Sequence, residues 1–137
     1  MHLDPAAFVA EPELIRTMDR QAIPISCTED LVLFRQGDAP MGLYILKSGE
    51  VDLTMSSASG KEIVSTKASA GALLGLPGLI GNEPYSLTAV ALAGAKLGFV
   101  ARDSFTALMR NEPSMAFKIL QVLAAEVRSA RSAILQR

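Results

Sequence analysis

The spacing of hydrophobic residues changes twice along the chain and divides it into three parts. In residues 11–20, apolar side chains recur every three or four positions, which predicts a short amphipathic helix. Residues 31–100 carry short apolar runs. In one of them Val51, Leu53 and Met55 alternate with polar residues, as in a half-buried strand. The helical spacing returns after residue 101. Strands are expected at residues 31–35, 42–47, 50–55, 62–66, 86–92 and 95–100, and helices at 102–110 and 115–134.

Short strands about ten residues apart are typical of a β-sandwich or a jelly-roll barrel. The expected fold class is mainly β: a jelly-roll (double-stranded β-helix) barrel with flanking N-terminal and C-terminal α-helices. We expect a single domain over residues 1–137, with an N-terminal helical segment at 1–23, the barrel at 24–101 and C-terminal helices at 102–137. The glycine-rich span 70–81 is expected to form a loop or one helical turn.

The charge balance and the rare residue types exclude several classes of function. Thirteen Lys and Arg residues against fourteen Asp and Glu residues give a net charge of −1, without the basic excess that nucleic-acid or membrane-surface binding requires. The single histidine, His2, lies at the terminus, so no metal site built from several imidazoles is expected. The single cysteine, Cys27, fits a reducing compartment. With no signal peptide and no unbroken apolar span in the sequence, we expect a cytoplasmic protein.

Residues 33–51 carry a specific sequence motif. They read Leu-Phe-Arg-Gln-Gly-Asp-Ala-Pro-Met-Gly-Leu-Tyr-Ile-Leu-Lys-Ser-Gly-Glu-Val. This run resembles the first half of the cyclic nucleotide-binding domain, the sensor fold of the catabolite activator and fumarate–nitrate regulator families. The Gly-Asp turn, the Gly-x-x-Tyr-Ile-Leu strand and the Ser-Gly-Glu-Val turn follow in the family's order. The likeness covers residues 10–135 and implies a sensor domain of the same fold.

The resembled family holds its ligand with a phosphate-binding cassette. A Gly-Glu pair contacts the ribose, and the arginine of an Arg-Ser/Thr-Ala triplet pairs with the cyclic phosphate. Aligned with this pattern, the chain has Gly75-Leu76 in place of the pair and Leu87-Thr88-Ala89 in place of the triplet. Leucine replaces both charged residues, and residues 68–95 contain no Lys or Arg. Charge-assisted hydrogen bonds contribute about 1.5–3 kcal/mol each, so the loss should weaken cyclic nucleotide binding on the order of 10³-fold.

We therefore expect a degenerate cassette that does not bind cAMP or cGMP in the family's way. Three interpretations of the leucines stay open. In the first, Leu76 and Leu87 fill the former pocket and the domain has no small ligand. In the second, an apolar pocket accepts a different effector. In the third, Arg35 or Arg102 reaches the cavity from outside the cassette and restores an anion site. The candidate pocket residues are Gly75, Leu76, Gly78, Leu87, Thr88 and Ala89.

The C-terminal helix carries an apolar seam about two heptads long. The resemblance implies that this helix is a dimer interface and also covers the ligand pocket. Packing on its own barrel is the alternative. We expect a homodimer, because the helix is longer than a barrel of this size can cover. The seam consists of Leu120, Leu123, Val127, Ala130 and Ile134.

Neither nucleic-acid binding nor catalysis is expected. In transcription-factor members the last helix leads into a helix-turn-helix domain, whereas this sequence stops at Arg137 with a mildly basic end. Cys27 has no histidine to activate it, and a cupin-type enzyme, which shares the jelly roll, needs a His/Glu metal cluster that the strands lack. We expect no catalytic residue, no metal and no cofactor.

The predicted function is a cytoplasmic sensor or interaction module that dimerises and acts on a partner protein, without contacting a membrane. The alternatives are a ligand-free dimerisation scaffold and a sensor of a different small effector.

Overall fold

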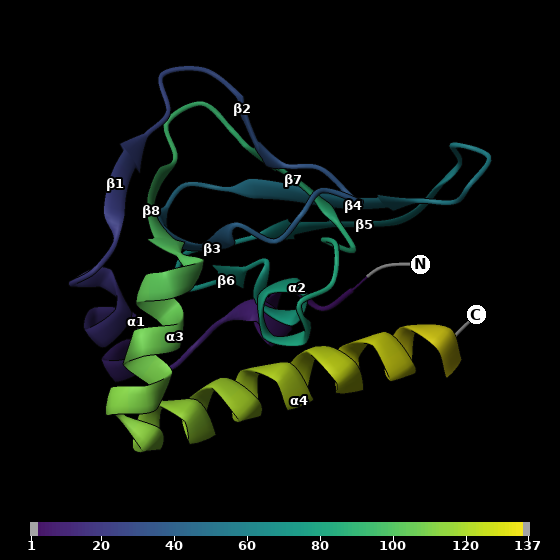
Figure 1. Cartoon of the computed structure of the whole chain (residues 1–137). Helices are drawn as coiled ribbons and strands as arrows, with labels where there is room; N and C mark the ends of the chain where they lie inside the picture. Colours follow the sequence, from purple (N-terminus) through teal and green to yellow (C-terminus); the bar gives the residue numbers. More distant parts are fainter. Residues whose placement is uncertain (1–2, 136–137) are drawn as a thin grey trace.

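The computed structural model describes residues 3–135. Helices lie at both ends of this span, and one short helix lies among the strands (Figure 1). The helical elements are η1 (Pro5–Phe8), α1 (Pro12–Asp19), α2 (Leu76–Gly81), α3 (Arg102–Asn111) and α4 (Pro113–Leu135). The strands are β1 (Ile23–Ser26), β2 (Leu31–Phe34), β3 (Gly42–Ser48), β4 (Val51–Ser56), β5 (Glu62–Ala68), β6 (Leu73–Leu74), β7 (Thr88–Ala91) and β8 (Lys96–Ala101).

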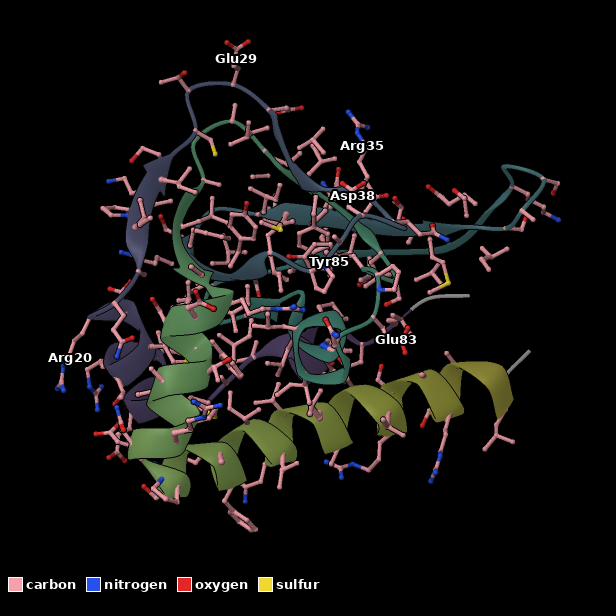
Figure 2. The ribbon with its side chains drawn as sticks, viewed as in Figure 1. Arg20, Glu29, Arg35, Asp38, Glu83 and Tyr85 are labelled. Atoms are coloured by element: carbon pink, nitrogen blue, oxygen red, sulfur yellow. The ribbon has the colours of Figure 1, made fainter. Side chains whose placement is uncertain are left out.

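The strands form two four-stranded antiparallel sheets. One sheet has the order β1-β8-β3-β6 and the other the order β2-β7-β4-β5, so neighbouring strands are distant in sequence except for the β4-β5 hairpin. This is the predicted jelly-roll architecture, and the fold class expected from strand spacing is confirmed. Charged side chains such as Glu29 and Arg35 point outward from the barrel (Figure 2). No helix within residues 3–135 is long and apolar enough to cross a membrane.

The β1-β8-β3-β6 sheet separates two hydrophobic cores. In β3, Leu46 and Tyr44 belong to the core inside the barrel, whereas Leu43 and Ile45 belong to the core on the other face, because successive strand side chains alternate. The second core lies between this sheet and the helices. It includes Ile119 of α4, which is 1% exposed. The N-terminal half of α4 is therefore packed on the sheet, and its C-terminal half continues past α2 (Figure 1).

Three short elements differ from the sequence-based prediction, which does not include them: η1, β1 and β6. Strand β1 has four residues, contains Pro24 and lies at a sheet edge, where a missing N–H costs no ladder hydrogen bond. Strand β6 has only two residues, too few to show a period. The glycine-rich span was expected to form a loop or one helical turn, and it contains the short helix α2.

Candidate functional site

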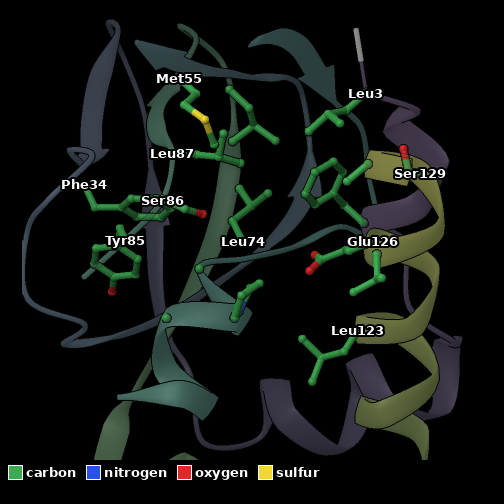
Figure 3. Close-up of a pocket in the computed structure, with 17 residues that line it drawn as sticks. Leu3, Phe34, Met55, Leu74, Tyr85, Ser86, Leu87, Leu123, Glu126 and Ser129 are labelled. Carbon is green, nitrogen blue, oxygen red and sulfur yellow. The ribbon is translucent and has the colours of Figure 1, made fainter. Parts of the chain in front are cut away.

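An apolar cavity of about 270 Å³ lies between the barrel interior and the C-terminal half of α4 (Figure 3). Four parts of the chain that are distant in sequence form its wall. The N-terminal segment contributes Leu3 and Phe8, the strands contribute Phe34, Leu53, Met55 and Leu74, the region around α2 contributes Gly75, Pro77, Gly78, Tyr85, Ser86 and Leu87, and α4 contributes Leu123, Glu126, Val127, Ser129 and Ala130.

Tyr85 forms a rigid part of this wall. Its ring stacks on that of Phe34, with centroids 4.0 Å apart and planes 18° from parallel. Its hydroxyl donates to the carbonyl of Gly42 and accepts from the Gly42 N–H. Gly75 makes room for the ring, because a Cβ at this position would lie 2.8 Å from it. Burial raises the pKa of Tyr85, so the phenol stays neutral and presents an apolar ring face to the cavity.

The predicted cassette residues do not all reach the cavity. Gly75, Gly78 and Leu87 line it. Leu76 does not, because it is the first residue of α2 and its side chain lies fully buried in the second core. The first interpretation of the leucines requires Leu76 to fill the cavity, and in this structure Leu76 does not do so.

The other two predicted residues belong to β7, which begins at Thr88. The Thr88 hydroxyl accepts from the Gln36 N–H, and Ala89 is buried in the barrel core away from the cavity lining. The residues that reach the cavity just before β7 are Tyr85, Ser86 and Leu87, two positions earlier than the aligned triplet.

No basic side chain among the described residues lines the cavity. Arg35 is exposed and points outward (Figure 2). Arg102, at the start of α3, donates from Nη2 to Asn82 Oδ1 at 2.7 Å. Neither arginine belongs to the cavity wall, so this structure does not contain the anion site that the third interpretation of the leucines requires.

Among the described residues, Glu126 is the one acidic side chain in the cavity wall, and its carboxylate points from α4 toward the barrel (Figure 3). Both carboxylate oxygens are buried, and neither has a hydrogen-bond partner within residues 3–135. Burial raises the pKa of Glu126 to about 8. Sequence reasoning did not select this residue. A signal was present, because Glu126 lies three positions after Leu123 and four before Ala130, on the apolar side of the helix.

The N-terminal segment closes one end of the cavity and joins α4 to the barrel. The carbonyl of Leu3 accepts from the Thr66 hydroxyl of β5 at 2.9 Å, and the Asp4 N–H donates to Ser129 Oγ of α4 at 2.9 Å. At the other end of α4, Lys118 Nζ lies 2.8 Å from Glu11 Oε1 and 2.7 Å from Glu13 Oε2. These contacts fix α4 along its length. His2 lies outside the described residues.

The predicted seam of α4 does not form one face. Leu123 and Ala130 line the cavity, whereas Leu120 is 58% exposed. Val127 lies at the boundary, because it lines the cavity and is still 50% exposed. The side chain of Ile134 lies outside what the structure describes. Residues three positions apart point about 60° apart around a helix, so the edge of the contact with the barrel falls between Leu120 and Leu123.

A different apolar stripe faces solvent on α4. Phe117 is 64% exposed, and it is followed at spacings of three and four by Leu120, Ala124 and Val127, all at least partly exposed. We call these four residues the outer stripe. Their spacing is that of side chains that meet a second helix.

The comparisons with known proteins agree with this architecture. Residues 24–112 match the family model of the cyclic nucleotide-binding domain. The chain belongs to this family, and it is a regulatory domain with a cyclic nucleotide-binding-like fold.

This chain matches one part of each of several larger proteins. The chain is 32% identical over 98 residues to the Cyclic AMP receptor protein of Thermus thermophilus, covering 72% of this chain and 45% of that protein. It is 37% identical over 91 residues to Potassium channel KAT3 of Oryza sativa subsp. japonica, covering 66% of this chain and 17% of the channel. The crystal structure of the Thermus thermophilus Catabolite Activator Protein aligns with a TM-score of 0.78 and 26% identity, covering 96% of this chain and 62% of that one. The chain thus spans about half the length of the receptor protein.

Proposed function

We propose that this chain is a single regulatory domain that responds to a small apolar effector instead of a cyclic nucleotide, and that α4 transmits the response. The observation that carries this proposal is the composition of the cavity wall, in which apolar side chains surround one carboxylate and no described Lys or Arg takes part. Helix α4 supplies five of the wall residues, namely Leu123, Glu126, Val127, Ser129 and Ala130, so a ligand in the cavity would act directly on the position of this helix.

A cyclic phosphate is a poor occupant of this cavity. In a low-dielectric site an anion needs a cationic partner or several hydrogen-bond donors. The three residues before β7 offer little to an anion. The Tyr85 phenol is already hydrogen-bonded to Gly42, Ser86 is exposed, and Leu87 is apolar. Glu126 would add repulsion when ionised. The volume of about 270 Å³ also lies just below the range of roughly 300–1,000 Å³ typical of small-molecule sites.

Titration calorimetry tests the first part of this proposal. With cAMP or cGMP added to the full chain, we expect no binding heat at ligand concentrations up to about 1 mM, because losing two charge-assisted contacts weakens binding on the order of 10³-fold. The Cyclic AMP receptor protein of Thermus thermophilus, measured in parallel, is the positive control. Micromolar binding of either nucleotide to this chain would contradict the proposal.

The outer stripe supports a second part of the proposal, namely that α4 mediates homodimerisation. Helix α4 has 23 residues and is about 34 Å long, and only its inner face is covered by the barrel and the other helices. Two copies of the outer stripe can pack against each other about a two-fold axis, because the same residues then meet on both helices. Burial of Phe117 and Leu120 in such an interface removes two large exposed apolar side chains from water.

Sedimentation velocity at tens of micromolar chain concentration tests the homodimer. We expect a dimer for the wild type and a monomer for Leu120→Glu, since a charge at this position would be buried against its counterpart. Ala58→Glu is the control for an added charge, because Ala58 is exposed in the turn between β4 and β5, outside α4. A wild type that sediments as a monomer, or a Leu120→Glu variant that stays dimeric, would refute this part of the proposal.

The proposal contains no catalytic step. Cys27 is buried in the barrel core and does not line the cavity. Within residues 3–135 there is no group of three or more His, Cys, Asp or Glu side chains placed to hold a metal ion.

A further inference from the structure

We propose that the effector is a small apolar amine, held by an ion pair between its ammonium group and the Glu126 carboxylate inside the cavity. This inference rests on the proposed function, because it names the chemical class of the effector that this same cavity accepts.

The position of Glu126 is the first argument. Both of its oxygens are buried at the cavity wall and lack a hydrogen-bond partner among the described residues. A buried carboxyl group without a hydrogen-bond partner is destabilising, so a ligand group that pairs with it recovers part of this cost as binding free energy. Figure 3 shows the carboxylate pointing from α4 toward Leu74 across the cavity, so a small shift of this side chain would bring its buried oxygens into contact with a ligand there.

The chain itself supplies no cation there, as far as the described residues extend. Of their titratable groups, only Glu126 and the Tyr85 phenol line the cavity, and the phenol is bonded to Gly42. On the N-terminal segment packed against α4, the Asp4 carboxylate accepts from the Ala6 N–H. On α4 itself the neighbouring Arg128 is exposed and lies outside the wall. The cation that completes the ion pair therefore has to come from the ligand.

The rest of the wall selects the body of the ligand. Apolar groups meet at the centre of the cavity, among them Leu74, Leu87, Met55 and the stacked rings of Phe34 and Tyr85. An apolar cavity of roughly 150 Å³ accommodates a benzene ring, so about 270 Å³ leaves room for one aromatic ring with a short chain. Such a body gains free energy from burial of its own apolar surface.

Amine binding should release protons. Burial keeps most of the Glu126 carboxyl protonated at pH 7.5, because its pKa is raised to about 8. An ammonium group at the carboxylate favours the ionised form and lowers this pKa, so the proton leaves as the amine binds. A neutral ligand of the same shape leaves the protonation of Glu126 unchanged.

Three probes with one aromatic ring and different polar ends test this inference on the full chain at pH 7.5: 2-phenylethylamine, 2-phenylethanol and phenylacetate. We expect calorimetry to show the amine binding at least tenfold more tightly than the alcohol, with no detectable binding of the carboxylate. Titrations in two buffers of different ionisation enthalpy should show release of more than half a proton per bound amine. In Glu126→Gln, the affinity for the amine should fall at least tenfold, while the affinity for the alcohol stays within threefold.

Glu29→Gln is the matched control, because it makes the same substitution in an exposed loop at the far end of the barrel (Figure 2). Its preference for the amine should equal that of the wild type. Equal affinities for amine and alcohol, or a preference that survives Glu126→Gln, would overturn the amine class while leaving an apolar effector cavity in place. Micromolar binding of cAMP would instead overturn the proposed function itself, so the two failures are distinguishable.

Discussion

Between pH 4 and pH 8, the free energy of unfolding of Glu126→Gln should rise by about 4–5 kcal/mol relative to that of the wild type. Below pH 4.5 the carboxyl is protonated in both the folded and the unfolded chain. Between pH 4.5 and about 8 the unfolded chain loses this proton and the folded chain keeps it, because burial raises the folded pKa to about 8. Over this window the wild type loses about 1.4 kcal/mol of stability per pH unit.

Urea denaturation at pH 4, 6 and 8.5 measures this difference. All variants are compared at one protein concentration, since self-association would couple stability to concentration. Glu29→Gln serves again as the control and should follow the wild type at each pH, because Glu29 is exposed. The same pH dependence of stability for Glu126→Gln and the wild type would mean that Glu126 is solvated in the folded chain. It would contradict the role of Glu126 as a buried partner for the amine.

Much of the barrel could be predicted from local patterns. In β4 the alternation of Val51, Leu53 and Met55 with polar residues is confirmed, with Val51 and Leu53 at most 1% exposed. Such strands have one buried face, so the two-residue period of their apolar side chains identifies both the strand and the face that is buried. Strand β6 has two residues, too few to show a period, and β1 contains Pro24, a residue that argues against a strand in sequence-based prediction, so neither was predicted.

The cavity was less predictable, because its wall depends on contacts between residues far apart in sequence. Gly75, Gly78 and Leu87 could be selected from the resemblance, and they line the cavity. Leu3 could not be selected, since its place depends on a hydrogen bond to Thr66, 63 positions away. Leu76 was misplaced for a different reason: it begins α2, and the direction of that turn sends its side chain into the second core.

Helix α4 combines the two parts of the proposed function. Its inner face supplies Glu126 to the cavity, and its outer stripe supplies Leu120 to the proposed dimer. Val127 lies between the two faces and belongs to both. A ligand that moves the inner face must move the outer stripe with it, because a helix of this length is rigid across its diameter. We therefore expect amine binding and the dimer dissociation constant to be thermodynamically coupled.

Gly49, in the turn between β3 and β4, should be a sensitive glycine position outside the cavity. Gly49→Ala should destabilise the fold by about 3 kcal/mol or more. The residue has φ +87°, which costs a residue with a Cβ about 1–2 kcal/mol. A Cβ would also lie 2.6 Å from the Cα of Ala95, which is fully buried ahead of β8. Because backbone atoms cannot move aside as a flexible side chain can, this overlap adds about 1–3 kcal/mol.

Gly60→Ala separates the two contributions. Gly60 lies in the turn between β4 and β5 with φ +88°, and a Cβ there would have no atom within 4 Å. This variant should therefore lose only the roughly 1–2 kcal/mol of backbone strain. Thermal or urea denaturation of both variants measures the difference. Equal losses for Gly49→Ala and Gly60→Ala would mean that the turn tolerates a side chain beside Ala95, and that the close approach of the two segments does not require glycine.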